Sequence, residues 1–270
     1  MKRDVTSRIV LKVTETADLV FAIAVASPHA PAAETLTATL DGTPVQTTEL
    51  PDAHGGRLHR LRADPGELVV EYAATVLGKV VPPASRADSA DETEILVYSR
   101  PSRYAESDTL APTAGAEFAG LDSDLDTLTA ISSWVGTRLA YVSGSSLPTD
   151  GAVRTLLARQ GVCRDYAHLC VALLRARGIP ARLVAVYAPG LSPMDFHAVA
   201  EAWVEGAWRV VDATALAPRQ SLVRIATGRD AADTAFLNVM SGRADLMEVT
   251  VTAVVDALPA DDLDEFVTIG

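Results

Sequence analysis

Cysteine, lysine and aromatic residues are scarce in this sequence. Two of its 270 residues are cysteines, 5% are aromatic, and the only lysines are Lys2, Lys12 and Lys79. If Cys163 and Cys170 share a helix, their Cα atoms lie about 10 Å apart at the rise of an α-helix. A disulfide needs less than about 7 Å. We therefore expect two free thiols in a reducing compartment.

Long apolar runs and basic runs are also missing. No stretch of about 18 apolar residues is present, so no transmembrane helix is expected. The N-terminus lacks the apolar segment of a secretory signal. The net charge of −12 disfavours binding to nucleic acid or to an anionic membrane. With 49% hydrophobic and 21% charged residues, the composition is typical of a folded globular protein, and the cytoplasm is the expected location.

The first 90 residues are predicted to form an antiparallel β domain. Short segments rich in β-branched or alternating residues are separated by turn signals such as Asp41-Gly42 and Asp64-Pro65-Gly66. The expected strands are Thr6–Val13, Asp18–Val25, Glu34–Leu40, Val45–Leu50, Arg57–Ala63 and Glu67–Val76. The stretch Val80–Glu92, with its Pro82-Pro83 pair, is interpreted as a linker.

Residues 91–260 have the mixed pattern of an α+β domain, and residues 261–270 form an acidic tail that we expect to fray. Apolar residues at helical spacing predict helices over Asp124–Leu139, Thr149–Arg159 and Cys163–Arg177. Strands are expected over Arg182–Tyr187, His197–Glu205, Trp208–Ala213 and about Met247–Val255.

Cys163 is predicted to lie where a loop meets the start of a helix. The unpaired N–H groups of a helix N-terminus favour the thiolate, which is the reactive form of cysteine. Gly161 allows a tight turn into the helix, and the Cys163 N–H is placed to donate to an oxyanion. The alternative is a small buried side chain, the usual fate of a free cysteine. For Cys170, in the apolar body of the helix, core packing is the stronger interpretation.

A thiol needs a base, and His197 is the candidate. His29, His54 and His59 lie in the β domain, and His168 points away from Cys163 on the same helix.

Asp212 ends an apolar run, where a carboxylate needs a partner. A two-residue loop at Glu205-Gly206 would pair Val204 with Ala207 and bring His197 diagonally next to Asp212. A loop at Gly206-Ala207 would widen the gap.

Three motifs in order resemble the transglutaminase-like superfamily, and its bacterial cysteine-protease-like branch in particular. They are Cys163 in GVCRDYAHL, His197 in DFHA and Asp212 in VVDAT. Weaker matches surround them, in residues 100–108, 178–182 and 224–233. The resemblance implies a papain-like core in which the helix carrying Cys163 packs on an antiparallel sheet carrying His197 and Asp212. It also implies a thioester acyl-enzyme intermediate.

Further residues near these motifs are candidates for supporting roles. Gln160 is a candidate second oxyanion donor, with a solvent-facing loop residue as the alternative. Arg164 and Asp165 are interpreted as helix-start charge and support. Tyr166 and Trp203 are candidates for the lining or support of the cleft, with core packing as the alternative for the tryptophan.

The leading functional hypothesis is a cysteine hydrolase of peptide, isopeptide or related amide bonds, acting on a protein or peptide substrate. An acyltransferase that uses an amine acceptor is the runner-up, and a binding module that has lost turnover is the third hypothesis. No cofactor is expected. A metal site is disfavoured because Cys163, Asp165, His168 and Cys170 on one helix cannot form a tetrahedral shell. The sequence leaves the oligomeric state open.

Overall fold

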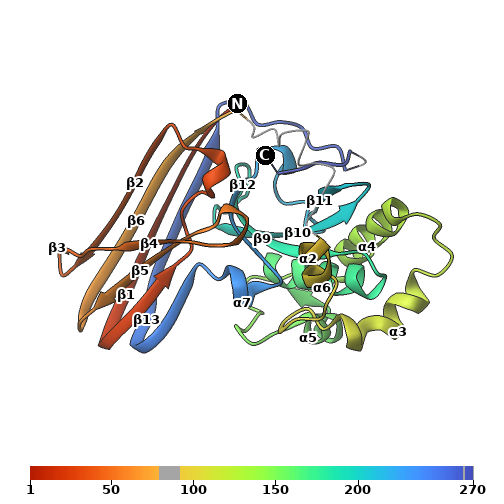
Figure 1. Ribbon diagram of the computed structural model, residues 1–270, viewed down its shortest axis with the longest axis horizontal. Helices are drawn as coiled ribbons and strands as arrows, with labels where there is room; N and C mark the ends of the chain where they lie inside the picture. The colour runs from red at the N-terminus through yellow and green to blue at the C-terminus, as the bar shows by residue number, and fades with distance from the viewer. Residues whose placement is uncertain (79–91, 264, 270) are drawn as a thin grey trace.

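The computed structural model describes residues 1–78, 92–263 and 265–269 (Figure 1). A large antiparallel sheet lies beside a core of helices and a smaller sheet, which confirms the predicted α+β architecture with an N-terminal β domain. The predicted domain boundary at residue 90 and the predicted linker, apart from Glu92, lie outside the described residues. None of the described helices has the length and apolar character needed to cross a bilayer.

The large sheet has seven strands in the order β3-β2-β6-β1-β5-β4, with β13 pairing to β1. All its pairs are antiparallel. The strands are β1 (Lys2–Phe21), β2 (Ala33–Leu40), β3 (Thr43–Pro44), β4 (Thr48–Pro51), β5 (Arg57–Ala63), β6 (Gly66–Leu77) and β13 (Leu237–Val255). Two short 3-10 helices, η1 (Ser27–His29) and η2 (Ala53–Gly55), interrupt the connections.

Strand β1 replaces two of the expected strands. The segments Thr6–Val13 and Asp18–Val25 were predicted to be separate strands, but β1 runs without interruption from Lys2 to Phe21. The polar residues between the two segments belong to the same strand, and the register between β1 and β13 shifts there. Such bulges let a strand bend without ending. The first part of β1 pairs with β6 and its last part with β5. In contrast, the expected strand Val45–Leu50 is replaced by the short strands β3 and β4.

Strand β13 corrects the predicted domain assignment. We placed Met247–Val255 inside the catalytic segment 91–260, but β13 starts at Leu237 and pairs with β1 in the N-terminal sheet, from Leu237 opposite Phe21 to Val255 opposite Arg3. Its alternating apolar residues fit either sheet equally well, and Val251 and Ala253 are buried against the N-terminal core. The N-terminal sheet is therefore completed by a segment near the other end of the chain.

The core consists of a four-stranded antiparallel sheet and the helices around it. The sheet order is β11-β10-β9-β12, and a parallel two-stranded ladder joins β7 to β8. Its strands are β7 (Ala140–Tyr141), β8 (Gln160–Gly161), β9 (Ala181–Tyr187), β10 (Phe196–Val204), β11 (Ala207–Val211) and β12 (Val223–Gly228). Its helices are α2 (Glu92–Tyr98), α3 (Ser107–Glu117), α4 (Asp124–Arg138), α5 (Ala152–Ala158), α6 (Cys163–Ala176), α7 (Ala231–Thr234) and the 3-10 turn η3 (Arg219–Ser221).

Helix α6 is the centre of the core. Leu169, Val171, Leu173 and Leu174 have no solvent exposure and pack among α3, α4, α5 and β10. Gly178 follows the helix with a φ of 82°, a conformation that favours glycine and stops the helix. The helix predicted for Cys163–Arg177 is thus confirmed to within one residue.

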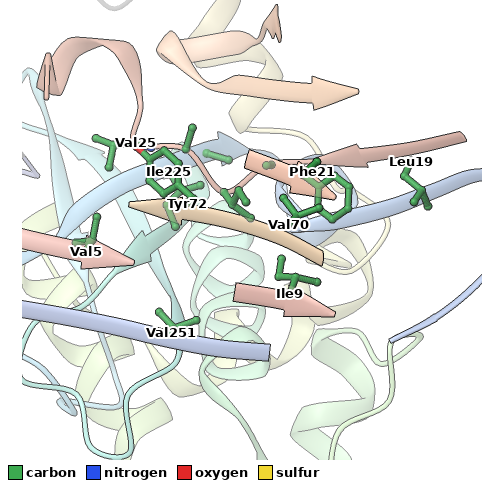
Figure 2. Close-up of a cluster of buried hydrophobic side chains, with 14 of the residues drawn as sticks. Val5, Ile9, Leu19, Phe21, Val25, Val70, Tyr72, Ile225 and Val251 are labelled. Atoms are coloured by element: carbon green, nitrogen blue, oxygen red, sulfur yellow. Dashed lines mark hydrogen bonds between the residues drawn. The ribbon is translucent and has the colours of Figure 1, made fainter. Parts of the chain in front are cut away.

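The large sheet packs against the core through an apolar layer. Figure 2 shows Val25 and Tyr72 of the N-terminal part beside Ile225 of β12, and all three belong to one buried cluster. The Tyr187 hydroxyl, on β9, donates to the Ile23 carbonyl at 2.8 Å. These contacts fix the sheet relative to the strands that carry the candidate site.

A buried ion cluster lies in the middle of the smaller sheet. The Glu201 side chain is 1% exposed. It accepts from Arg182 Nε at 2.7 Å and from Arg224 Nη2 at 2.6 Å. The Arg182 guanidinium stacks 3.9 Å from the centre of the Trp208 ring. The two arginines hold the pKa of Glu201 at about 2, although burial alone would raise it.

The acidic tail is more ordered than we expected. The Val210 N–H donates to the Val267 carbonyl at 2.8 Å, and Arg219 pairs with Asp261 at 3.0 Å. Val267 and Ile269 are buried. The prediction of a fraying tail is therefore wrong for its described residues.

Candidate active site

Cys163 is the first residue of α6 and is partly exposed to solvent. Val162 before it is extended, with φ of −112° and ψ of 180°, so the chain turns sharply into the helix. A Cβ at Gly161 would lie 2.7 Å from Asp165 Cβ, which explains why glycine is needed there. The thiol therefore sits at the positive end of the helix dipole.

His197 and Asp212 form a buried pair. His197 Nε2 lies 2.8 Å from Asp212 Oδ2. Asp212 Oδ1 also accepts from the backbone N–H and the hydroxyl of Thr214, at 3.0 and 2.6 Å. These bonds fix the orientation of the carboxylate, and the carboxylate in turn fixes the orientation of the imidazole ring through Nε2.

The β10–β11 hairpin brings this pair together. Val204 pairs with Ala207 across a two-residue loop, and Glu205 and Gly206 have φ of 52° and 73°. Two positive φ values are typical of the type I′ turn that matches the twist of a hairpin. The register predicted for a Glu205-Gly206 loop is confirmed, and the alternative loop is not formed.

The charge distribution favours a protonated imidazole. Burial opposes a charge on His197, but Asp212 outweighs it and, together with Cys163, raises the pKa of His197 to about 10. Burial also opposes the charge on Asp212, yet His197 and Thr214 lower its pKa. His197 Nδ1 is buried and makes no hydrogen bond within the described residues. Cys163 and His197 line the same pocket.

Cys163 and His197 open into a pocket of about 380 Å³. Most of its wall comes from the core, but Ala22, which follows β1, and Asn238 of β13 also line it. The pocket therefore lies between the core and the N-terminal sheet, and both parts of the molecule shape it.

Comparisons with known proteins agree with this arrangement. The model of a family described as the transglutaminase-like superfamily matches residues 112–213, a range that includes Cys163, His197 and Asp212. The solved structure of a candidate cysteine protease from Cytophaga hutchinsonii is 33% identical, over 97% of this chain and 94% of that chain, with a TM-score of 0.87. The chain belongs to the transglutaminase-like superfamily.

Two mycobacterial relatives of this superfamily member have no assigned function. An uncharacterised protein of Mycobacterium leprae is 27% identical over 202 residues, which cover 68% of this chain and 71% of that protein. An uncharacterised protein of Mycobacterium tuberculosis is 41% identical over 63 residues, or 23% of this chain and 20% of that protein. The mycobacterial relatives thus leave the reaction and the substrate open.

Tyr141 is a site residue that the sequence interpretation missed. It pairs with Gly161, two residues before Cys163, and its ring centroid lies 6.0 Å from that of Tyr166 on the first turn of α6. Burial, followed by the Cys163 sulfur, raises the pKa of Tyr141 to about 12, so the hydroxyl keeps its proton. Tyr141 lies on β7, whose parallel pairing with Gly161 of β8 brings it to the start of α6. A two-residue strand gives no sequence pattern that would reveal this contact.

Arg164, Asp165 and Tyr166 support the turn around Cys163. Asp165 is buried and accepts from the Val162 N–H at 2.8 Å and from the Ser146 hydroxyl at 2.9 Å. The Tyr166 hydroxyl donates to the Leu139 carbonyl at 2.9 Å. Arg164 lines the pocket and reaches the same loop as Asp165. Arg164 and Asp165 thus hold the loop after β7 against the first turn of α6, and Tyr166 holds the residue that precedes β7.

Gln160 and Trp203 are not brought to the pocket. The Gln160 residue is exposed and is absent from the described lining of the pocket. Trp203 lies beside the hairpin loop at the far end of β10, where it packs edge-on against Trp208 with 5.5 Å between ring centroids. Six residues separate it from His197, about 20 Å along a strand. Nothing in these positions supports the roles that we considered for them.

Cys170 and His168 are buried in the core. Burial raises the pKa of the Cys170 thiol, with Asp212 adding to the effect. His168 Nε2 accepts from the Ala231 N–H at 3.1 Å, and the ring stacks on Tyr104. Among the described residues, no group of three histidine, cysteine or acidic side chains is arranged to hold a metal ion.

Proposed function

We propose that this protein is a cysteine-dependent hydrolase of peptide, isopeptide or related amide bonds. The observation that carries the proposal is the 2.8 Å contact between His197 Nε2 and Asp212 Oδ2, which leaves Nδ1 as the ring atom available to the thiol of Cys163. A nucleophile, a base and a group that orients the base are the parts that acyl transfer through a thiol requires.

In the proposed reaction, the Cys163 sulfur attacks the carbonyl carbon of the amide. His197 then gives its proton to the leaving amine, the C–N bond breaks, and a thioester to Cys163 remains. A water molecule passes a proton to His197 and attacks the thioester, which releases the carboxylic acid and restores the thiolate and the imidazolium. Asp212 stays bonded to Nε2 throughout and keeps the imidazole ring in one orientation.

The tetrahedral intermediates carry an oxyanion that needs donors. The Cys163 N–H at the first turn of α6 is one candidate, and the Tyr141 hydroxyl, whose pKa is influenced by Cys163, is the other. Tyr141 thus takes the role for which we had considered Gln160.

The test combines labelling and turnover. Iodoacetamide at pH 7 is expected to modify Cys163 much faster than the buried Cys170, as resolved by mass spectrometry. A library of peptides and isopeptides should be cleaved by the wild-type protein and not by Cys163→Ala. Equal, slow labelling of both cysteines together with no turnover would contradict the proposal and favour a binding module.

The same assay separates hydrolysis from transfer. A labelled primary amine is added with a glutamine-containing peptide. Release of ammonia without incorporation of the label supports the hydrolase, whereas incorporation of the label would make the protein an acyltransferase.

We also propose the cytoplasm as the place where the enzyme acts, since its nucleophile must stay reduced. Fractionation of producing cells tests this, and recovery of the native protein outside the cytoplasm would contradict it.

A further inference from the structure

The pocket around Cys163 is apolar inside. Leu183, Ile225, Phe196 and Phe236 line it. The rings of Phe196 and Phe236 stack with 5.2 Å between centroids and 23° between planes. A charged group placed on this surface would lose its water without gaining a partner. Charge on a bound substrate must therefore lie toward the mouth of the pocket.

Besides His197, the described lining of the pocket contains two charged side chains, Arg164 and Asp195. Arg164 Nη2 donates to the Ser146 hydroxyl and to the Leu147 carbonyl, both at 2.6 Å, whereas Nε is buried without a partner within the described residues. The Nη2 bonds tie the side chain to the loop at Ser146. Its positive charge is also opposed by Asp165, 3.5 Å away.

Asp195 is different. Its Oδ1 accepts from the Phe196 N–H at 2.7 Å, and within the described residues it forms no ion pair with a lysine or an arginine. The residue is exposed, so a ligand can reach it. Burial nevertheless raises the pKa of Asp195, while the Phe196 N–H and the His197 charge lower it. A carboxylate in this state is stabilised by a cation that arrives from outside.

Asp195 lies close to the reacting groups. It directly precedes the two pocket residues Phe196 and His197, and it lines the same pocket as Cys163. A group bound by Asp195 therefore occupies the pocket in which Cys163 attacks the amide.

We propose that Asp195 determines substrate specificity by binding a cationic side chain, an ammonium or a guanidinium, next to the scissile amide. The remaining part of the pocket then takes an apolar side chain. This inference rests on the proposed function for the reaction, but the charge preference itself can be measured without any turnover.

The first experiment measures how charge affects access to Cys163. The purified full-length protein reacts with two methanethiosulfonate reagents, one carrying a trimethylammonium group and the other a sulfonate, and mass spectrometry follows modification of Cys163. We expect Asp195→Asn to lower the ratio of the cationic to the anionic rate about five- to tenfold. Asparagine keeps an oxygen for the Phe196 N–H, so the local backbone is preserved. The control is Asp108→Asn, which removes the same charge from an exposed position outside the described pocket lining.

The second experiment uses peptides that differ at one position beside the cleaved bond, with lysine, norleucine or glutamate. The wild type should prefer lysine in kcat/KM, and Asp195→Asn should lose about five- to tenfold of that preference, measured as the ratio of kcat/KM on the lysine peptide to that on the norleucine peptide.

The outcomes separate the two proposals. An unchanged ratio of reagent rates in Asp195→Asn, with a thermal midpoint equal to that of the wild type, overturns the role of Asp195. A changed ratio with no peptide cleaved supports the cation preference and counts against the hydrolase. Equal loss of activity on all three peptides would also overturn the inference, since it would mean a general effect on the site.

Discussion

Strand β10 carries two buried groups of charged side chains, one around Glu201 and one around His197, that differ in how many of their polar atoms are hydrogen-bonded. Glu201 gives both carboxylate oxygens to arginines, Arg182 and Arg224. Four residues away, His197 is equally buried, but its Nδ1 makes no hydrogen bond within the described residues and lies beside the pocket of Cys163. Burial and charge alone therefore do not mark a reactive site. The proposed function depends instead on a buried ring nitrogen that has no partner in the described part of the chain, in the pocket that Cys163 also lines.

The comparison predicts its largest effect for Asp212→Asn. Asparagine can still bond the imidazole, but it no longer stabilises the positive charge, so kcat should fall about 10³–10⁴-fold. Turnover of the best library peptide is the measurement, and circular dichroism checks the fold. A loss below about tenfold would mean that the pair is as structural as the Glu201 cluster.

In the Glu201 cluster the expected effect is on stability. Glu201→Gln removes the carboxylate that pairs with Arg224 and leaves Arg182 with Glu94 as its remaining acidic partner, at a cost of about 3–5 kcal/mol in the free energy of unfolding. Urea unfolding measures this, and the exposed Glu205→Gln is the control, with a change within about 0.5 kcal/mol. A variant as stable as the wild type would show that the arginines find water or other partners.

Two tyrosines near Cys163 sharpen the same distinction. Tyr141→Phe removes a proposed oxyanion donor and should lower kcat/KM about 10- to 100-fold with little change in stability. Tyr166→Phe breaks the bond to the Leu139 carbonyl and should cost about 1 kcal/mol in stability, with a smaller effect on rate. A large loss of rate in Tyr166→Phe and a loss of stability alone in Tyr141→Phe would mean that Tyr166 has the catalytic role and Tyr141 the structural one.

The two clusters should also weaken at opposite ends of the pH scale, a smaller effect. Glu201 contributes stability that is present above its ordinary pKa of 4.5 and is lost as the pH falls through about 2. His197 contributes stability that is present below 6.5 and is lost as the pH rises through about 10. Urea midpoints from pH 2 to 10 test this. Glu201→Gln should flatten the acid limb and Asp212→Asn the alkaline limb; unchanged limbs would contradict the assignment.

Local patterns were enough to predict that Cys163 begins a helix and that a hairpin brings His197 next to Asp212. The strand Arg57–Ala63 has the predicted bounds because turn residues flank an alternating run. Gly206 and the two-residue loop fix the register that joins His197 to Asp212. Each of these features depends on residues close together in the sequence, where sterics and alternation decide the outcome.

Contacts between distant segments were not predictable in this way. The alternation in β13 does not say which sheet it joins, and its partner β1 lies more than 200 residues earlier. Helix α3 contains Pro112, which weakens a helical pattern, although packing of Leu110 and Ala114 on α6 holds the helix together. Tyr141 comes near the start of α6 because two very short strands, β7 and β8, pair with each other.

The return of β13 to β1 makes the core an insertion within the N-terminal sheet. Arg3 pairs with Val255, and the Met1 ammonium lies 4.0 Å from the Asp256 carboxylate. The start of β1 and the end of β13 therefore lie side by side (Figure 1). During synthesis Leu237–Val255 emerges from the ribosome after the whole core, so one edge of β1 stays unpaired until β13 has been made. The wall of the pocket that Asn238 provides is assembled last, and a nascent chain has its thiol in place before it has a complete cleft.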